Sequence, residues 1–235
     1  MMKVLLVNPK SEYTFKEENQ LPLPLLYIAA KLEGVVDVKI IDQQLGNWEN
    51  ELTNNLDQDV LCVGVTSMTG PQLKQAIRIS KMVKSKGIPV IWGGIHASLT
   101  TEQTLLNDFV DIVVIGEGDL TFPEVVSQLL GNKELDKVNG IAYKKDGKVR
   151  FTSQRNQIDM DALPEVPYHL VDMSKYFLHP TSNPTERVLP IQTSRGCPYN
   201  CKFCYNLLFN MSGIYHWSID QWTKSTIIYW KVIYS

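Results

Sequence analysis

The fold is decided by the stretch Val60-Leu-Cys-Val-Gly-Val65, the loop Thr66-Ser-Met-Thr-Gly70 that follows it, and a helix expected between Pro71 and Gly87. The first run is short, apolar and rich in β-branched residues, as a buried parallel strand requires. The helix has a proline at its start and a glycine at its end, which are the residue types preferred at those positions. Together they form one strand–loop–helix unit.

Four further β-branched runs resemble this strand in the first half of the chain. They are Lys3–Val7, Val36–Ile41, Pro89–Trp92 and Asp111–Ile115. Helices are expected between the strands, one of them between Pro24 and Gly34, and a last one from Phe122 to Leu130. Five such repeats predict an α/β fold with a doubly wound parallel sheet, in the flavodoxin-like strand order 2-1-3-4-5.

The pattern changes after Gly131. Gly140–Tyr143 and Lys148–Phe151 flank a Lys-Asp-Gly turn and predict a hairpin, and several prolines after it predict an extended linker. We therefore expect three parts: a sheet domain in residues 1–135, a hairpin and proline-rich linker in residues 136–185, and the start of a second domain in residues 186–235.

Composition bounds the class of protein. The chain has 235 residues, of which 44% are hydrophobic and 20% charged, as in ordinary soluble globular proteins. Its net charge of −2 gives no reason to expect nucleic acid or an anionic membrane as a partner. No apolar run is long enough to span a bilayer, and the N-terminus resembles a strand rather than a signal peptide. Cys62 is expected to pack as a small buried hydrophobe, and reduced thiols favour a cytoplasmic location.

Glycines and small polar residues follow the predicted strands. The segments are Asn8-Pro9, Thr66–Gly70, Gly93–Ala97 and Gly116–Asp119. In a doubly wound sheet, ligands bind beyond the carboxyl ends of the strands, and paired glycines let the backbone approach a ligand closely. A large, flat ligand with a polar edge suits this rim. A dinucleotide does not, because Gly-x-Gly-x-x-Gly is missing after the first strand. A phosphoacceptor receiver domain would need an acidic cluster at the first strand, whereas FMN stays open.

Three cysteines lie on one short loop: Cys197, Cys201 and Cys204. A [4Fe–4S] cluster normally takes four cysteine ligands, so three would leave one iron open to a substrate or cofactor. Zinc stays an alternative, with His216 as a fourth ligand, although structural zinc sites usually take four closed ligands. A disulfide framework is disfavoured because an odd number of cysteines leaves one thiol unpaired.

The spacing of these cysteines resembles that of the radical S-adenosylmethionine (SAM) superfamily. Phe203 immediately before the last cysteine strengthens the resemblance, as does the approach Leu189-Pro-Ile-Gln-Thr-Ser-Arg-Gly196, in which a short strand leads to a Ser-Arg-Gly turn. Five other segments resemble the cobalamin (B12)-binding domain that precedes radical SAM barrels, together with its linker: Val7–Pro9, Leu21–Ala30, Gly93–Ala97, Gly116–Asp119 and Ala162–Pro167.

The resemblance implies a B12-binding flavodoxin-like sheet followed by the start of a radical SAM partial barrel. It implies three cofactors, namely a [4Fe–4S] cluster held by the three loop cysteines, SAM and cobalamin. Phe203 is expected to place its backbone against the adenine of SAM, while its side chain is expected to be a packing aromatic. The expected cobalamin-binding residues are Asn8, Thr66, Ser67, Gly93, Gly94, His96, Gly116, Glu117 and Gly118.

Particular roles follow for a few of these residues. No Asp-x-His-x-x-Gly motif occurs. The family resemblance implies cobalamin held without a protein histidine on cobalt. His96 is then expected to hydrogen-bond either a neighbouring loop or the edge of the corrin. Glu117 is expected to accept hydrogen bonds from backbone N–H groups or corrin amides. Arg195 is expected either to support the cysteine loop or to form a surface ion pair. No catalytic side chain is assigned.

By resemblance, the activity is the reductive cleavage of SAM and the transfer of a methyl group to a carbon or phosphorus centre. The partners implied are a small-molecule substrate and a reductant such as flavodoxin or ferredoxin. A radical SAM cyclase, a cobalamin-binding module without catalysis and a zinc-dependent interaction protein stay open. The segment from Asn206 to Ser235 holds one acid and three of the five tryptophans, which leads us to expect a truncated or frame-shifted barrel.

Overall fold

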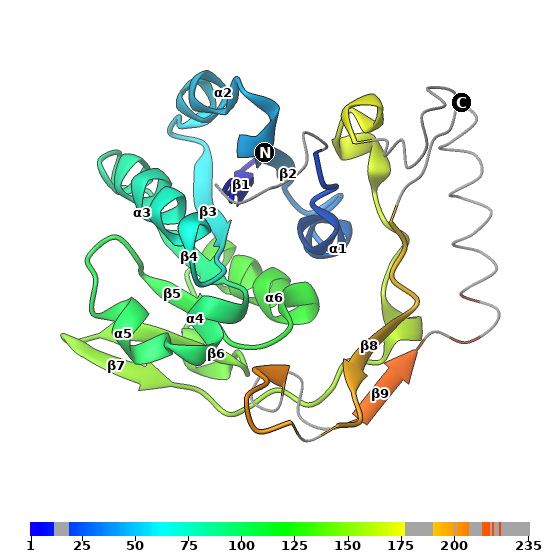
Figure 1. Cartoon of the computed structure of the whole chain (residues 1–235). Helices are drawn as coiled ribbons and strands as arrows, with labels where there is room; N and C mark the ends of the chain where they lie inside the picture. Colours follow the sequence, from blue (N-terminus) through cyan, green and yellow to red (C-terminus); the bar gives the residue numbers. More distant parts are fainter. Residues whose placement is uncertain are drawn as a thin grey trace.

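The body of the protein is a seven-stranded sheet with helices on both faces (Figure 1). The structure is a computed structural model, and it describes residues 1–11, 19–176, 190–199, 201–206, 213–216, 218 and 221. The sheet has the strand order β2-β1-β3-β4-β5-β6-β7. Its first five strands are parallel, so the predicted flavodoxin-like order 2-1-3-4-5 is confirmed.

The five parallel strands lie close to the predicted runs. They are β1 (Lys3–Asn8), β2 (Asp37–Asp42), β3 (Val60–Thr66), β4 (Val90–Gly93) and β5 (Ile112–Val114). Alternate side chains of β1 enter two different cores, with Val4 and Leu6 on one face and Leu5 and Val7 on the other. Such burial on both faces explains why the strands are apolar runs rather than alternating patterns.

Two layers of helices cover the sheet. One layer contains α1 (Leu23–Ala30) and α6 (Gly118–Leu130), and the other contains α2 (Trp48–Asn55), α3 (Pro71–Lys84), α4 (Ile95–Leu99) and α5 (Thr101–Leu105). Two of these differ from prediction. The segment Gly93–Ala97 is not all loop, because α4 begins directly after Gly94, and α6 begins at Gly118 rather than at Phe122. A proline usually marks the first turn of a helix, whereas Pro123 lies inside α6.

The predicted hairpin is confirmed, and it belongs to the main sheet. The strands β6 (Ile141–Lys145) and β7 (Lys148–Phe151) pair antiparallel with each other, and β6 pairs antiparallel with β5. Ile141 and Ala142 are fully buried, so the hairpin completes the core beside β5. The sheet therefore continues past the boundary predicted at residue 135, while the three-part division of the chain stays a prediction.

The linker packs against the sheet domain. The linker contains three short 3-10 turns: η3 (Met160–Ala162), η4 (Tyr168–Leu170) and η5 (Met173–Lys175). Two further 3-10 turns precede it, η1 (Gln43–Leu45) after β2 and η2 (Leu135–Lys137) after α6. Ile158, Met160 and Leu163 form a small core with Tyr27 of α1. Tyr168 and Tyr176 join the larger core beneath α1 and α6. Two of its prolines, Pro180 and Pro184, lie outside the described residues.

The cysteine segment begins with a strand instead of the predicted Ser-Arg-Gly turn. The strand β8 (Ser194–Cys197) pairs antiparallel with β9 (Gly213–His216), so that Ser194 lies opposite His216. Hydrogen bonds to β9 hold this stretch in an extended conformation, and the local sequence does not reveal this pairing. The tryptophan-rich tail expected to be unusual lies almost entirely outside the described residues. Among the helices in the described ranges, none combines the length and apolar character needed to cross a bilayer.

Candidate functional site

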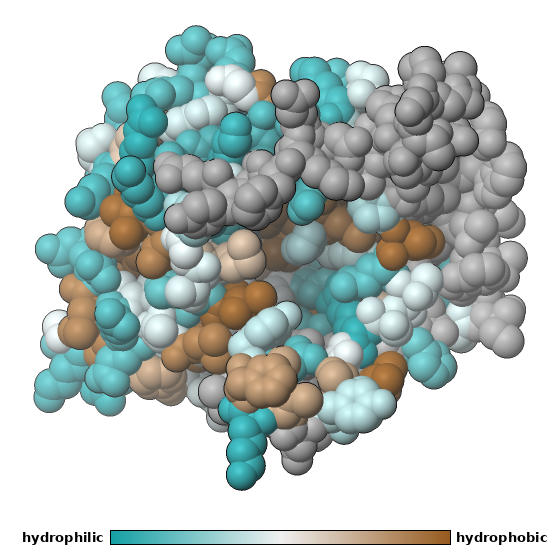
Figure 2. Space-filling view, viewed as in Figure 1, coloured by the Kyte–Doolittle hydropathy of each residue, from teal (hydrophilic) through white to brown (hydrophobic). Residues whose placement is uncertain are grey.

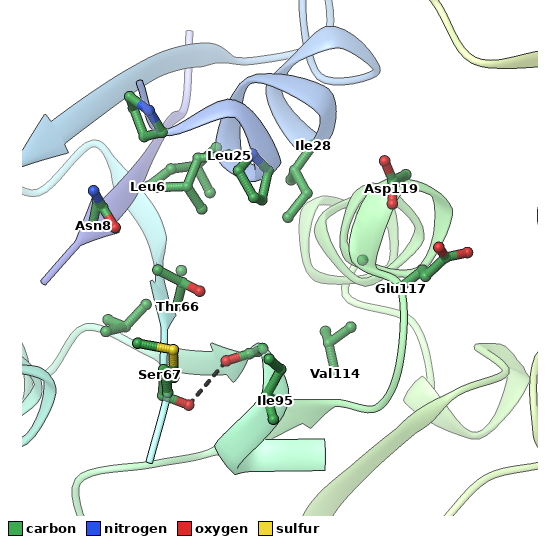
Figure 3. Close-up of a pocket in the computed structure, with 18 of the residues that line it drawn as sticks. Leu6, Asn8, Leu25, Ile28, Thr66, Ser67, Ile95, Val114, Glu117 and Asp119 are labelled. Carbon is green, nitrogen blue, oxygen red and sulfur yellow. Dashed lines mark hydrogen bonds between the residues drawn. The ribbon is translucent and has the colours of Figure 1, made fainter. Parts of the chain in front are cut away.

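A cavity of about 710 Å³ opens at the carboxyl ends of the parallel strands (Figure 3). It lies where the connections leaving β1 and β3 run to opposite faces of the sheet, which is the usual ligand position in this fold. Eight of the nine residues predicted for cobalamin line it: Asn8, Thr66, Ser67, Gly93, Gly94, Gly116, Glu117 and Gly118. Figure 2 shows this face of the molecule hollowed near its centre, with hydrophobic and hydrophilic residues side by side.

The cavity has an apolar floor and a polar rim. The floor is formed by apolar side chains of the sheet, α1 and α6, namely Leu6, Leu25, Ile28, Ile91, Val114 and Phe122. The rim is rich in side-chain carboxamides, contributed by Asn8, Gln20, Gln44, Gln72, Gln192 and Asn206. Each carboxamide donates and accepts hydrogen bonds. A corrin ring has an apolar body and primary amides at its edge, so the residues present fit this group.

Two glycines shape the wall at β4. Gly94 has φ +91°, and a Cβ there would lie 2.7 Å from the carbonyl oxygen of Ser67. The ends of β3 and β4 are therefore in close contact. Ser67 Oγ donates to the Gly93 carbonyl at 2.9 Å (Figure 3). Ser67 N donates to the same carbonyl at 2.9 Å. A Cβ on Gly93 would meet only Val114 at 3.9 Å. Gly93 thus leaves space in the cavity that a larger side chain would occupy.

His96 lies in α4, and it is not among the cavity-lining residues of the described chain. Its Nδ1 is 3.0 Å from the hydroxyl of Thr69, and its Nε2 is 3.2 Å from the hydroxyl of Thr100. Burial lowers the pKa of the imidazole. The hydrogen bond to a neighbouring loop, one of its two expected roles, is therefore present. A contact between His96 and the corrin stays a prediction.

Arg195 contacts the opposite wall of the cavity. Its guanidinium donates to both carboxylate oxygens of Asp119, at 2.9 and 2.8 Å, and to Glu117 at 3.3 Å. The side chain of Arg195 is 9% exposed and that of Asp119 is 6% exposed, so this is not the surface ion pair that the sequence left open. The sequence identifies Asp119 only as part of a motif. The signal that could have identified Asp119 is its position in the first turn of a helix, where carboxylates are favoured.

Asp42 is a second buried carboxylate that sequence reasoning missed. It ends β2, is 2% exposed, and accepts hydrogen bonds from Asn8 Nδ2 at 3.1 Å, from Gln44 and from Tyr176. Burial raises the pKa of Asp42, and these hydrogen bonds oppose the shift. Its position directly after a strand, at the ligand-binding edge, is the signal that could have found it. Asp42 orients the cavity-lining side chains of Asn8 and Gln44.

The cysteine loop lies beside the cavity. Cys197 and Cys204 are half-buried, Cys201 is exposed, and the Cys204 N–H donates to the Cys201 carbonyl at 2.9 Å. Phe203 is 93% exposed, so the expectation that its side chain is a packing aromatic is wrong, while the contact of its backbone with adenine stays a prediction. Among the described residues, no three His, Cys, Asp or Glu side chains are arranged to hold a metal ion, and Asn200 of the loop is outside those residues. All three thiols are free on one short loop, and this donor set fits an iron–sulfur cluster with three protein ligands.

The loop and the sheet domain share the cavity. Ser194, Arg195 and Gly196 line it before the cysteines, and Tyr205 and Asn206 line it after them. A ligand on the sheet edge and a ligand on the cysteine loop would therefore face a common space.

The sequence has clear relatives. Residues 17–126 match the family model of the B12 binding domain. The chain is 35% identical over 222 residues to an uncharacterized methyltransferase of Pyrococcus horikoshii, covering 88% of this chain and 46% of that protein. It is 29% identical over 254 residues to cytidylyl-2-hydroxyethylphosphonate methyltransferase of Streptomyces wedmorensis, covering 86% and 47%. It is 26% identical over 215 residues to the anaerobic magnesium-protoporphyrin IX monomethyl ester cyclase of Synechocystis, covering 86% and 42%. The chain thus spans less than half the length of these relatives.

Solved structures have the same fold. The cobalamin-dependent SAM radical enzyme OxsB, with aqua-cobalamin and SAM bound, superposes with a TM-score of 0.78 at 24% identity, covering 96% of this chain and 31% of OxsB. The radical SAM methyltransferase TsrM of Kitasatospora setae, with cobalamin and a [4Fe–4S] cluster bound, gives 0.73 at 18% identity, covering 99% and 47%. The predicted fold class is confirmed. Residues 17–126 therefore belong to the B12-binding domain family, as the sequence predicts, and the chain shares its fold with the solved cobalamin-dependent radical SAM proteins.

Proposed function

We propose that this protein is a cobalamin-dependent radical SAM enzyme that transfers a methyl group to a carbon or phosphorus centre. The observation that carries the proposal is the shared cavity, whose walls are the B12-binding edge of the sheet and the residues flanking the cysteine loop. Radical methylation needs a methyl carrier and a radical source near one substrate, and this arrangement brings the two candidate cofactor sites together.

Each part of the cavity has a separate task in this proposal. When bound, the cluster with SAM supplies the adenosyl radical and cobalamin supplies the methyl group. Cys197, Cys201 and Cys204 hold the cluster through their thiolates. The apolar floor takes the body of cobalamin and excludes water, while Asn8 and Glu117 exchange hydrogen bonds with its amides. No residue of this chain is assigned a proton transfer, because radical hydrogen abstraction does not require one.

Two alternatives are favoured by specific observations. A radical SAM cyclase is supported by the similarity to the Synechocystis cyclase. A cobalamin-binding module without chemistry is supported by residues 17–126, which match the B12 binding domain and supply most of the cavity lining. The methyltransferase, the cyclase and the binding module would all bind cobalamin in this cavity. Cobalamin binding therefore distinguishes these three functions from the zinc-binding alternative.

We also propose the partners and location expected from the family. The substrate is a small molecule, and flavodoxin or ferredoxin supplies the electron that the cluster passes to SAM. Cys62 is buried and the three loop thiols are free, as they would be in the cytoplasm.

The test combines cobalamin binding with anaerobic reconstitution of the chain by iron and sulfide. We expect saturable uptake of hydroxocobalamin, and a cluster absorbance that disappears in Cys197→Ala, Cys201→Ala and Cys204→Ala. Cys62→Ala is the matched control, because it removes a thiol outside the loop and should keep the cluster. Cobalamin uptake without cluster or SAM cleavage would favour the binding module. Zinc in place of iron, without cobalamin uptake, would contradict the proposal.

A further inference from the structure

In the described part of the chain, the side chain of Arg195 joins the cysteine segment to the sheet domain. Arg195, in β8, reaches Asp119 and Glu117 at the start of α6, and its guanidinium carbon lies 5.0 Å from the ring centre of Tyr27 in α1. Its Nε also donates to Gln192 at 3.0 Å. These contacts join residues that are 76 positions apart in the chain.

The geometry is specific to arginine. The two Nη–H groups form the paired, parallel hydrogen bonds with the Asp119 carboxylate that a planar guanidinium allows. The same plane lies over the aromatic ring of Tyr27, and Nε is free to reach Gln192. A lysine ammonium would keep the positive charge but would lose the paired geometry and most of the stacking.

Burial makes the contact costly to break. Arg195 and Asp119 are both more than nine-tenths buried, and Glu117 is 16% exposed. Burial by itself disfavours the charged guanidinium, but the hydrogen bonds and charges of Asp119 and Glu117 outweigh it and raise the pKa of Arg195. Removing either partner would leave an uncompensated charge in a poorly solvated site.

The location of the contact links it to both candidate cofactor sites. Arg195 lies two residues before Cys197 in the same strand, and Arg195, Glu117 and Asp119 all line the cavity. Within the described chain, the guanidinium is the cation that lies between the two cavity-lining carboxylates.

We propose that Arg195 and Asp119 form a clamp that holds the first cysteine of the loop against the rim of the cavity. Its functional meaning rests on the proposed function, because a fixed loop position sets the separation between the cluster and cobalamin. Arg195 is thus a positioning residue. The Asp119 carboxylate is its main anchor, and Glu117 supplies additional negative charge.

The test measures how fast each thiol is alkylated by iodoacetamide in the cofactor-free chain, by mass spectrometry of the cysteine peptides. Arg195→Gln and Asp119→Asn should each raise the alkylation rate of Cys197 by about tenfold, equivalent to about 1.4 kcal/mol of lost loop stabilisation. The double variant should show little further increase, because both changes remove one interaction. Arg195→Lys should fall between wild type and Arg195→Gln.

The chain offers a matched control at an exposed site. Arg78 Nη2 donates to both carboxylate oxygens of Glu49, at 2.9 and 2.8 Å, and the guanidinium carbon of Arg78 lies 5.2 Å from the ring centre of Trp48. Arg78→Gln should leave the alkylation of Cys197 unchanged. Cys62 is the internal reference, because it is buried and its pKa is raised to about 12 by desolvation.

Two results would overturn the clamp. One is an unchanged Cys197 rate in both Arg195→Gln and Asp119→Asn. The other is a parallel increase at Cys62, which would mean general loss of the fold rather than release of the loop. Neither result depends on cofactors, so a failure of the clamp is distinguishable from a failure of cobalamin or cluster binding.

Discussion

The hydroxyl of Tyr176 donates a 3.0 Å hydrogen bond to the carboxylate of Asp42, although the two residues are 134 positions apart. Tyr176 belongs to the end of the linker and is 1% exposed, and Asp42 ends β2 at the edge of the cavity. The linker therefore reaches the ligand-binding edge and takes part in its hydrogen-bond network.

Removing this hydroxyl should destabilise the protein. Tyr176→Phe keeps the ring but leaves the buried Asp42 with one donor fewer, and a hydrogen bond to a charged group contributes about 1.5–3 kcal/mol. We expect a decrease of about that size in the free energy of unfolding, measured with urea. Tyr199→Phe, at an exposed position, is the control and should change stability by less than about 0.5 kcal/mol. Equal effects of the two changes would contradict the role of the contact.

Asp42 should also make stability depend on pH. Burial raises the pKa of its carboxyl above the ordinary value of 3.8, so the folded state binds this proton more tightly than the unfolded state. The contribution of the Asp42 carboxyl group to the stability of the folded state is therefore fully present below pH 3.8, and it is lost as the pH rises through the pKa of the folded state. Asp42→Asn removes this titration. The stability of the wild type relative to Asp42→Asn should therefore fall as the pH rises above 3.8 in urea titrations. A constant or rising difference over that range would show that the shift has the opposite sign or is absent.

Gly94 should tolerate no side chain. Gly94→Ala combines two costs, a residue at φ +91° and a Cβ placed 2.7 Å from the Ser67 carbonyl oxygen. Gly87 has φ +73°, and a Cβ added there would meet no atom within 4 Å, so Gly87→Ala reports the backbone strain alone. That strain costs about 1–2 kcal/mol. We expect Gly94→Ala to cost about 1–3 kcal/mol more than Gly87→Ala, because the neighbouring loop has to move. Similar midpoints of thermal unfolding for the two variants would show that the loop contact is unimportant.

Gly93 should affect binding without affecting folding. A Cβ at this position meets only Val114, at 3.9 Å, and the space beyond it is the cavity. Gly93→Leu should therefore fill part of the cavity and weaken hydroxocobalamin binding by about tenfold or more, equivalent to about 1.4 kcal/mol. Its urea midpoint should stay close to that of the wild type.

Gly93→Ala is the size control for that measurement and should retain most of the affinity. Unchanged cobalamin affinity in Gly93→Leu would place the ligand elsewhere, whereas a collapse of stability in both variants would mean that the wall at β4 is tighter than the structure indicates.

Much of the fold was predictable because its signals are local. The apolar runs of β1 to β5 lie buried on both faces, so their composition alone distinguishes them from amphipathic strands. The helix α6 begins at Gly118, four residues before the predicted start at Phe122, and its N-cap residue Glu117 makes no side-chain capping hydrogen bond that would mark this start. Membership of β6 and β7 in the main sheet was not predictable from their turn, since a hairpin sequence specifies its own pairing but not its neighbour.

Some residues of the candidate site were likewise predictable from local signals, and others were not. Asn8, Thr66, Ser67 and the rim glycines could be found because the residues after parallel strands always meet at one edge of the sheet. Asp42 and Asp119 were missed because their importance lies in partners that are distant in sequence, Tyr176 and Arg195.

The sequence by itself determined the five parallel strands, the glycine-rich edge and the three-cysteine loop, because each depends on residue types at short spacing. Only the tertiary structure decided that Arg195 pairs with Asp119, that Tyr176 reaches Asp42, and that the loop and the sheet share one cavity. The physical reason is that a buried charge must find a partner somewhere, but which partner lies within hydrogen-bonding distance is settled only when the whole chain is packed.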